Sequence, residues 1–175
     1  MKKNLFLATA LVVAFASCKK SNSTPDSPHI TFTVDGTSKT FNTGLTANKY
    51  VGSQESIIIA GLTSLTGGEA FTLILGASGS NSITAKTYVY TDAGFSFDAT
   101  YASGVGGSTN YEAGSTFSQS ASHIGQTVTN NMVLHITAID AVSIKGTFSG
   151  DFYLDGDATQ SKKSITNGDF YAKFQ

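Results

Sequence analysis

Apolar and polar residues alternate with a period of two along most of this chain, which is the pattern of half-buried β-strands. Residues 30–34 alternate in this way, Asp35 and Gly36 follow, and residues 37–41 continue the alternation. Because an Asp-Gly dipeptide favours a tight two-residue turn, this segment predicts a β-hairpin. Further along, residues 57–59 are consecutive isoleucines, and this run predicts a central strand that is buried on both faces.

The C-terminal part has the most regular alternation. One predicted strand places Met132, Leu134, Ile136 and Ala138 on one face, and a longer strand follows over residues 144–152. Two glycines inside that longer strand, Gly146 and Gly150, indicate close packing or β-bulges. About ten predicted strands separated by turns imply an all-β fold, either an antiparallel β-sandwich or a partly closed β-barrel.

The amino-acid composition argues against nucleic-acid binding and against a helical fold. Charged residues make up 13% of the 175 residues, every basic residue is Lys, and the formal net charge is −1. A protein that binds nucleic acid through its backbone phosphates needs a basic surface, so we expect no nucleic-acid partner. Coiled coils and helical bundles require far more Ala, Glu, Leu and Lys than this chain contains.

The first residues have the layout of a secretory signal. Lys2 and Lys3 precede a short apolar run that is shorter than a transmembrane span requires, and small residues end it at Ser17. We therefore expect a signal-peptide helix ahead of the β domain. The only cysteine of the chain, Cys18, follows directly, so no disulfide can form within the chain.

Residues 15–18, Phe-Ala-Ser-Cys, resemble the lipobox of bacterial lipoproteins. The resemblance implies cleavage between Ser17 and Cys18 and a lipid, including fatty acyl chains such as palmitate, on Cys18. The expected organisation is a signal peptide over 1–17, a flexible polar tether over 18–28 and one β-domain over 29–175. Acyl chains hold a protein stably at a bilayer, so the membrane is the expected partner.

Three short segments carry a second resemblance, and they are residues 32–36, 144–150 and 165–170. Together they resemble an uncharacterised domain family of small Bacteroidota lipoproteins, which has no assigned catalytic residues. The resemblance implies an all-β fold and a membrane address. Within these segments Gly36 and Gly168 suit turns. Because Lys19 and Lys20 follow the cysteine where surface-exported relatives have acidic residues, we expect an outer-membrane lipoprotein that faces the periplasm.

Few residues point to catalysis. The three histidines, His29, His123 and His135, have no zinc-binding spacing, and no nucleophile elbow supports a hydrolase. Asp155 and Asp157 flank a glycine and are weak calcium candidates, because Asp-Gly is first of all a turn former. We expect no catalytic residue, no cofactor and no metal.

The leading hypothesis is a non-enzymatic binding or structural module of the cell envelope. An alternative is a carbohydrate-binding module, in which exposed rings stack on sugars. Its candidate residues are four tyrosines that lie close in sequence: Tyr88, Tyr90, Tyr101 and Tyr111. A hydrolase with an unrecognised site is the third hypothesis. The partner beyond the membrane, a glycan or an envelope protein, stays open.

Overall fold

The computed structural model describes residues 27–114, 131–157, 159 and 161–175. The expected signal helix, Ser17, Cys18 and nearly all of the tether lie outside the described residues. Within them the regular structure is β-strand, and no helix is long and apolar enough to cross a bilayer. The strands are β1 (His29–Val34), β2 (Thr37–Phe41), β3 (Thr43–Val51), β4 (Glu55–Leu62), β5 (Ala70–Ala77), β6 (Thr87–Val89), β7 (Phe95–Ser103), β8 (Thr109–Gly114), β9 (Val133–Ile139), β10 (Ser143–Leu154) and β11 (Lys162–Lys173).

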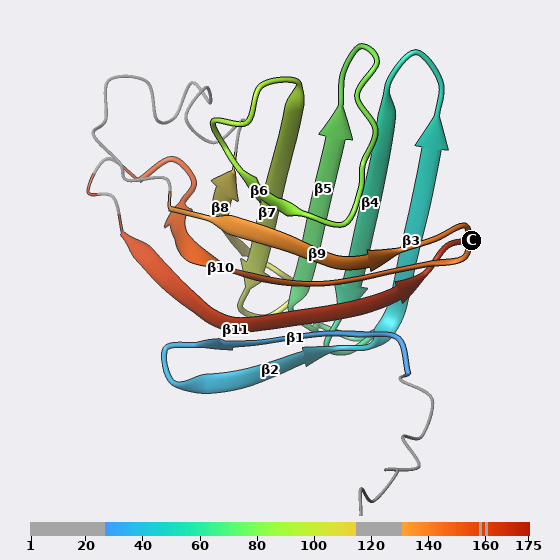
Figure 1. The fold of residues 1–175 in the computed structure, drawn as a ribbon. Helices are drawn as coiled ribbons and strands as arrows, with labels where there is room; N and C mark the ends of the chain where they lie inside the picture. Colours follow the sequence, from blue (N-terminus) through green and yellow to red (C-terminus); the bar gives the residue numbers. More distant parts are fainter. Residues whose placement is uncertain (1–26, 115–130, 158, 160) are drawn as a thin grey trace, which may run out of the picture.

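The strands form one continuous sheet that folds over into two layers. Its order is β2-β1-β11-β10-β8-β7-β5-β4-β3, and β9 pairs with both β10 and β6. In Figure 1 the strands β3, β4, β5, β7 and β8 form one layer, and the other strands run across them in the second. The sheet nearly closes where Ala47 of β3 forms a bridge with Phe174, and Gln175 N donates to Ala47 O at 3.0 Å. The expected all-β fold is confirmed.

Strand β10 forms the corner between the two layers. It pairs with β9 over residues 144–149 and with β8 at Tyr153 and Leu154. Its register with β11 shifts between Phe148 and Gly150, and Gly150 has a φ of +155°. The extra residue of this shift lies in β11, where Thr166 and Asn167 lie opposite Ser149 of β10, so the bulge belongs to β11 and not to Gly150. An added Cβ on Gly150 would lie 2.6 Å from Met132 Cα, so of the two predictions for this glycine close packing is confirmed.

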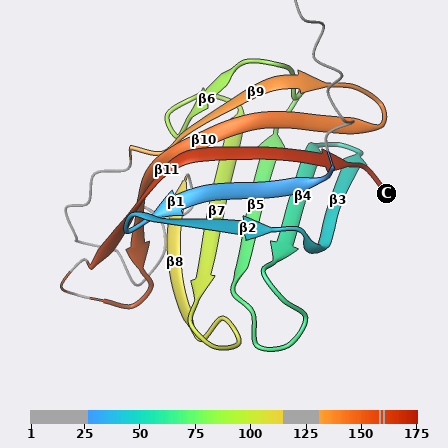
Figure 2. The ribbon, with the colours of Figure 1, turned by 90° about the horizontal axis from the view of Figure 1, so that it is seen from below.

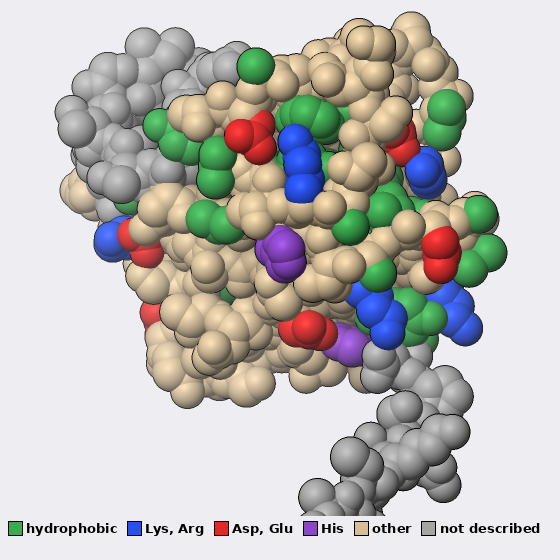
Figure 3. Space-filling view, viewed as in Figure 1, with side chains coloured by type: hydrophobic (Ala, Val, Ile, Leu, Met, Phe, Trp, Pro, Cys, Tyr) green, Lys and Arg blue, Asp and Glu red, His purple; other side chains and the backbone are tan. Residues whose placement is uncertain are grey.

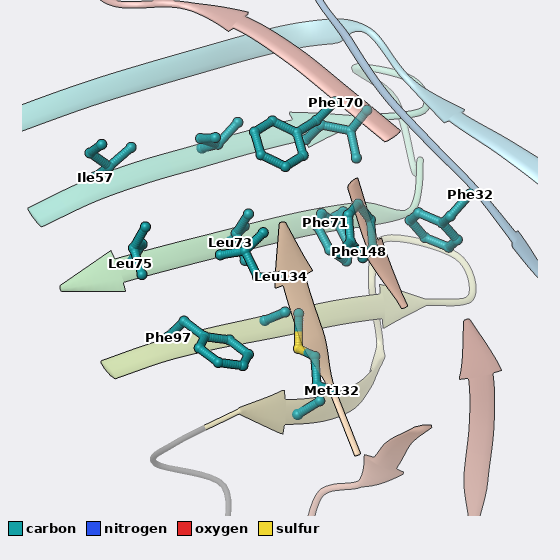
Figure 4. Packing of buried hydrophobic residues seen from close by; sticks show 14 of the residues in the cluster. Phe32, Ile57, Phe71, Leu73, Leu75, Phe97, Met132, Leu134, Phe148 and Phe170 are labelled. Carbon is teal, nitrogen blue, oxygen red and sulfur yellow. The ribbon is translucent and has the colours of Figure 1, made fainter. Parts of the chain in front are cut away.

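Aromatic rings from both layers fill the space between them. Phe71 of β5 stacks on Phe148 of β10 at 4.9 Å between ring centroids, and Phe32 of β1 lies 5.1 Å from Phe71. Figure 4 shows these rings meeting between the strands, with Phe170 and several aliphatic side chains around them. Such ring contacts add to the free energy that apolar burial itself supplies. The core is therefore continuous from one layer to the other.

The predicted hairpin and the predicted central strand are both present. Asp35 and Gly36 take φ values of 50° and 75° between β1 and β2, which is the backbone of a tight hairpin turn. Strand β4 lies between β3 and β5, as its isoleucines predict. Ile57 and Ile59 are buried, whereas Ile58 on the other face is only half-buried. The prediction that this strand is buried on both faces was therefore wrong. No second layer covers the outer face of β4 within the described residues.

Two details of the predicted alternation were wrong, and a bulge explains each. The β9–β10 register shifts between Lys145 and Gly146, which turns Ala138 to solvent and Ile139 toward the core. Gly168 lies inside β11 rather than in a turn, next to Asn167, whose φ is 52°. A Cβ atom on Gly168 would come within 2.8 Å of the Phe148 ring. Sequence alternation cannot show an inserted residue that reverses the faces of a strand.

Gly146 gives a direct test of the packing around β10, because the atoms nearest to it belong to the neighbouring strands β9 and β11. An added Cβ would lie 2.5 Å from His135 O and 2.6 Å from Phe170 Cζ. We expect Gly146→Ala to lower the free energy of unfolding by about 2 kcal/mol, because the core must shift to accept the methyl group. Gly52→Ala, where the nearest atom is 4.0 Å away, is the control and should change it by less than about 0.5 kcal/mol. Urea unfolding measures both, and equal effects would contradict the packing described here.

Candidate functional site

The four candidate tyrosines do not form an exposed strip. Tyr88 and Tyr101 have 0% and 2% of their surface exposed, Tyr111 is half-buried, and Tyr90 is 42% exposed. The Tyr88 hydroxyl donates to Thr84 O at 2.8 Å inside the fold. A sugar stacks on an open ring face, and Tyr88 and Tyr101 offer none, so the prediction of a stacking surface was wrong for these two residues.

Two of the tyrosines do come together at one end of the core. Tyr101 of β7 pairs in register with Tyr111 of β8, and their ring centroids are 6.3 Å apart. The Tyr101 ring packs edge-on against Phe32 at 5.4 Å, and its hydroxyl donates to Glu69 Oε1 at 2.9 Å. Tyr101 thus has its ring in the apolar core and its hydroxyl in a polar cluster at the rim.

Charged side chains from several strands complete this cluster. Lys39 Nζ of β2 lies 2.9 Å from Glu69 Oε2, just before β5, so this ion pair joins the two layers. Lys163 of β11 pairs with Asp35 of the first hairpin turn, and its Nζ lies 5.2 Å from the centroid of the Tyr111 ring. The group that we call the polar mouth consists of Asp35, Lys39, Glu69, Tyr101 and Lys163. It borders a cleft of about 260 Å³.

Two groups of the polar mouth, Glu69 and Tyr101, have pKa values that are shifted by their surroundings. Burial raises the pKa of Glu69, but hydrogen bonds from Lys39 and Tyr101 outweigh it and leave the pKa below its usual value. Burial and the Glu69 carboxylate raise the pKa of the Tyr101 hydroxyl well above its usual value. General acid–base catalysis needs a group that titrates near the working pH, and neither residue does so at neutral pH. The mouth is therefore suited to hydrogen bonding with a ligand or to joining the layers.

A second polar site lies on the outer face of β9, β10 and β11. A shallow depression of about 340 Å³ there is lined by His135, Asp169 and hydroxyl-bearing side chains. Figure 3 shows histidine and acidic side chains on this face. His135 Nδ1 lies 2.9 Å from Thr87 Oγ1, whereas Asp169 Oδ2 pairs with His29 Nε2 at 2.8 Å. The histidine that contacts a hydroxyl is thus not the one paired with the carboxylate, and a hydrolase site here stays a prediction.

The two weak calcium candidates have structural partners. Asp157 accepts hydrogen bonds from Thr159 N at 2.8 Å and Ser161 N at 3.0 Å, and hydrogen bonds from the Ser161 and Thr159 side chains and backbone lower its pKa. The Asp155 backbone N donates to Asn110 O at 3.0 Å. These bonds shape the turn before β11. Among the described residues no three His, Cys, Asp or Glu side chains are grouped so as to hold a metal ion.

Comparison with known proteins adds no relative to this picture. No family model, no curated protein and no solved structure matches the chain.

Sequence reasoning missed Lys39 and Glu69, which are the centre of the polar mouth. They lie thirty residues apart in the sequence, and no motif connects them. One signal was available: Glu69 lies between Gly68 and the mostly apolar residues 70–75 in a chain with few charges. A lone carboxylate next to a buried strand requires a partner, although the sequence does not say which lysine supplies it.

The Lys39–Glu69 pair predicts a pH-dependent coupling. A double-mutant cycle with Lys39→Met and Glu69→Gln should give a coupling of about 1 kcal/mol at pH 7, because the pair is partly exposed. Since the Glu69 pKa is lowered in the folded protein, this stabilisation is present above the unfolded pKa of about 4.3 and is lost as the pH falls through the folded pKa. Thermal unfolding of the four proteins at neutral and acidic pH measures it. An unchanged coupling in acid would contradict the ion pair.

Proposed function

We propose that this chain is a lipid-anchored protein of the cell envelope whose β-domain acts as a non-enzymatic binding or structural module. One observation carries the proposal: the only thiol of the chain, Cys18, ends a short apolar run that follows Lys2 and Lys3. Signal peptides have this layout. A single cysteine cannot form a disulfide within its own chain, so in an exported protein it indicates a chemically modified thiol.

The described domain is compatible with attachment through its N-terminal side. Ser27 is exposed at the surface, and β1 begins at His29. Residues 19–28, which are polar and contain both prolines of the chain, separate Cys18 from this strand. The buried core of the described residues extends from Ile30 to Ala172.

The proposed location of the protein is the periplasmic face of an outer membrane. Lys19 and Lys20 follow the anchor, and ammonium groups at this position attract anionic headgroups. The three segments that resemble small Bacteroidota lipoproteins support the same address. Within the module, the polar mouth is the proposed binding region, because ionised and hydroxyl groups from separate strands converge there. Its partner is a glycan or another envelope protein.

Cell fractionation tests the anchor. We expect the wild-type chain in the membrane fraction and Cys18→Ala almost entirely in the soluble fraction, because acyl chains supply most of the binding to the bilayer. Ser17→Ala is the matched control, since it keeps a small residue before the cysteine and should remain in the membrane. A Cys18→Ala chain that stays in the membrane to the wild-type extent would exclude the anchor.

A further inference from the structure

Strand β2 is one end of the sheet and presents an open hydrogen-bonding edge. Within the described residues it pairs with β1 alone, through a ladder that has no register shift. A two-residue turn closes the hairpin, so the pair formed by Val34 and Thr37 is hydrogen-bonded and every second pair after it is not. The backbone N–H and C=O groups of Ser38 and Thr40 therefore point away from β1.

These backbone groups are open to a further strand. Ser38 and Thr40 are exposed, and among the described residues no backbone hydrogen bond outside the β1–β2 ladder uses either of them. The opposite end of the sheet is partly closed, because Gln175 N donates to Ala47 O of β3 at 3.0 Å beside the bridge between Ala47 and Phe174. A row of open backbone groups such as that of β2 is a template for strand pairing.

Strand β2 lacks three features that block the pairing of an edge strand. These features are a proline, a β-bulge and a free charge. Residues 37–41 contain no proline, and their ladder with β1 contains no bulge. Their only charged side chain, Lys39, is paired with Glu69 at 2.9 Å. Its charge is therefore balanced and does not repel an incoming uncharged strand.

A groove lies beside the free edge of β2. Residues 38–40 line a cleft of about 640 Å³ together with the loops that precede β5 and β8. Figure 2 shows these loops beyond β2, on the side away from β1. The wall that they form includes Gly67, Gly68 and Gly104, which have no side chains, and Val105, which is 87% exposed. The groove leaves space for an extended chain next to the free backbone groups.

The lining of the groove indicates the chemistry of the added strand. Side chains of neighbouring strands align across a sheet, so alternate residues of an added strand lie on the same face as Lys39. On that face they meet Val105 and the Lys39–Glu69 pair, which has no net charge. An ionised side chain would lose water there without gaining a free counter-ion, whereas burying an apolar side chain is favourable. An uncharged segment with apolar residues at alternate positions therefore fits the groove.

From these observations we infer that the free edge of β2 binds an extended, uncharged segment of another polypeptide, which adds a strand to the sheet. Strand addition takes its affinity from backbone hydrogen bonds and its specificity from alternate side chains. The inference rests on the proposed binding module and names its partner as a polypeptide. A second copy of this chain fits less well, because pairing Ser38 of one β2 with Thr40 of the other places two Lys39 side chains opposite each other.

Hydrogen exchange tests the added strand directly. The experiment uses the isotope-labelled full chain, purified from membranes in detergent, and the probe is the capped peptide Ser-Val-Thr-Val-Ser-Val-Thr. We expect the amide protons of Ser38 and Thr40 to exchange freely without peptide, and about tenfold more slowly at a peptide concentration about ten times Kd. The matched control is the same peptide with every backbone nitrogen methylated. It keeps the side chains but cannot donate, so it should not slow the exchange.

Variants of the edge separate backbone pairing from side-chain contact. Ser38→Pro and Thr40→Pro each remove a donor that β1 does not use, so they should weaken peptide binding about tenfold or more. Ser38→Ala and Thr40→Ala keep the donors and should bind as the wild type does. Fluorescence anisotropy of the labelled peptide measures all four. Equal weakening by alanine and proline, or wild-type binding by the proline variants, would overturn the inference.

Other results would overturn it as well. Protection of the Ser38 and Thr40 amides without peptide would show that a second copy or another part of this chain occupies the edge. Protection by maltohexaose and not by the peptide would identify a glycan, and no effect of the peptide would exclude strand addition. The methylated peptide is compared on wild-type protein, so it decides the question even where a proline variant does not fold. A failure of the anchor is distinguishable, because it appears as soluble wild-type chain in cell fractionation whatever the peptide does.

Discussion

The contacts among Phe32, Phe71 and Phe148 are the interaction on which the rest of this structure depends. Each ring comes from a different strand, and the stack joins β1 and β10 of one layer to β5 of the other. With Cys18 as the only cysteine, no disulfide can substitute for this packing. Removing a buried Phe side chain from such a core costs about 3–5 kcal/mol, a large part of the stability of a domain of this size.

The same core positions the polar mouth. Tyr101 packs edge-on against Phe32, and this contact directs its hydroxyl to Glu69 at the rim. Glu69 in turn meets Lys39 from the edge strand β2, so the apolar stack and the ion pair hold the two layers together at the same end. The lowered pKa of Glu69 keeps this carboxylate ionised at neutral pH, and the raised pKa of Tyr101 keeps its hydroxyl protonated, so this pair favours hydrogen-bonded recognition over proton exchange.

Local sequence patterns predicted the elements of the fold well but not their long-range contacts. The Asp35-Gly36 hairpin and the crowded glycine at Gly146 follow from turn chemistry and from sheet geometry, which act over a few residues. The register shift opposite Ser149 and the one beside Ala138 depend on inserted residues, in β11 and in β9, that alternation does not show. The burial of Tyr88 and Tyr101 depends on which strands face each other, and one sequence does not contain that information.

We propose that the β-domain is held at a bilayer by a lipid on Cys18. Mass spectrometry of the native protein, purified from membranes, tests this claim most directly. The account predicts a chain that begins at Cys18, lacks residues 1–17, and carries a thioether-linked diacylglycerol on the cysteine. A chain that retains its first residues and an unmodified thiol would contradict it.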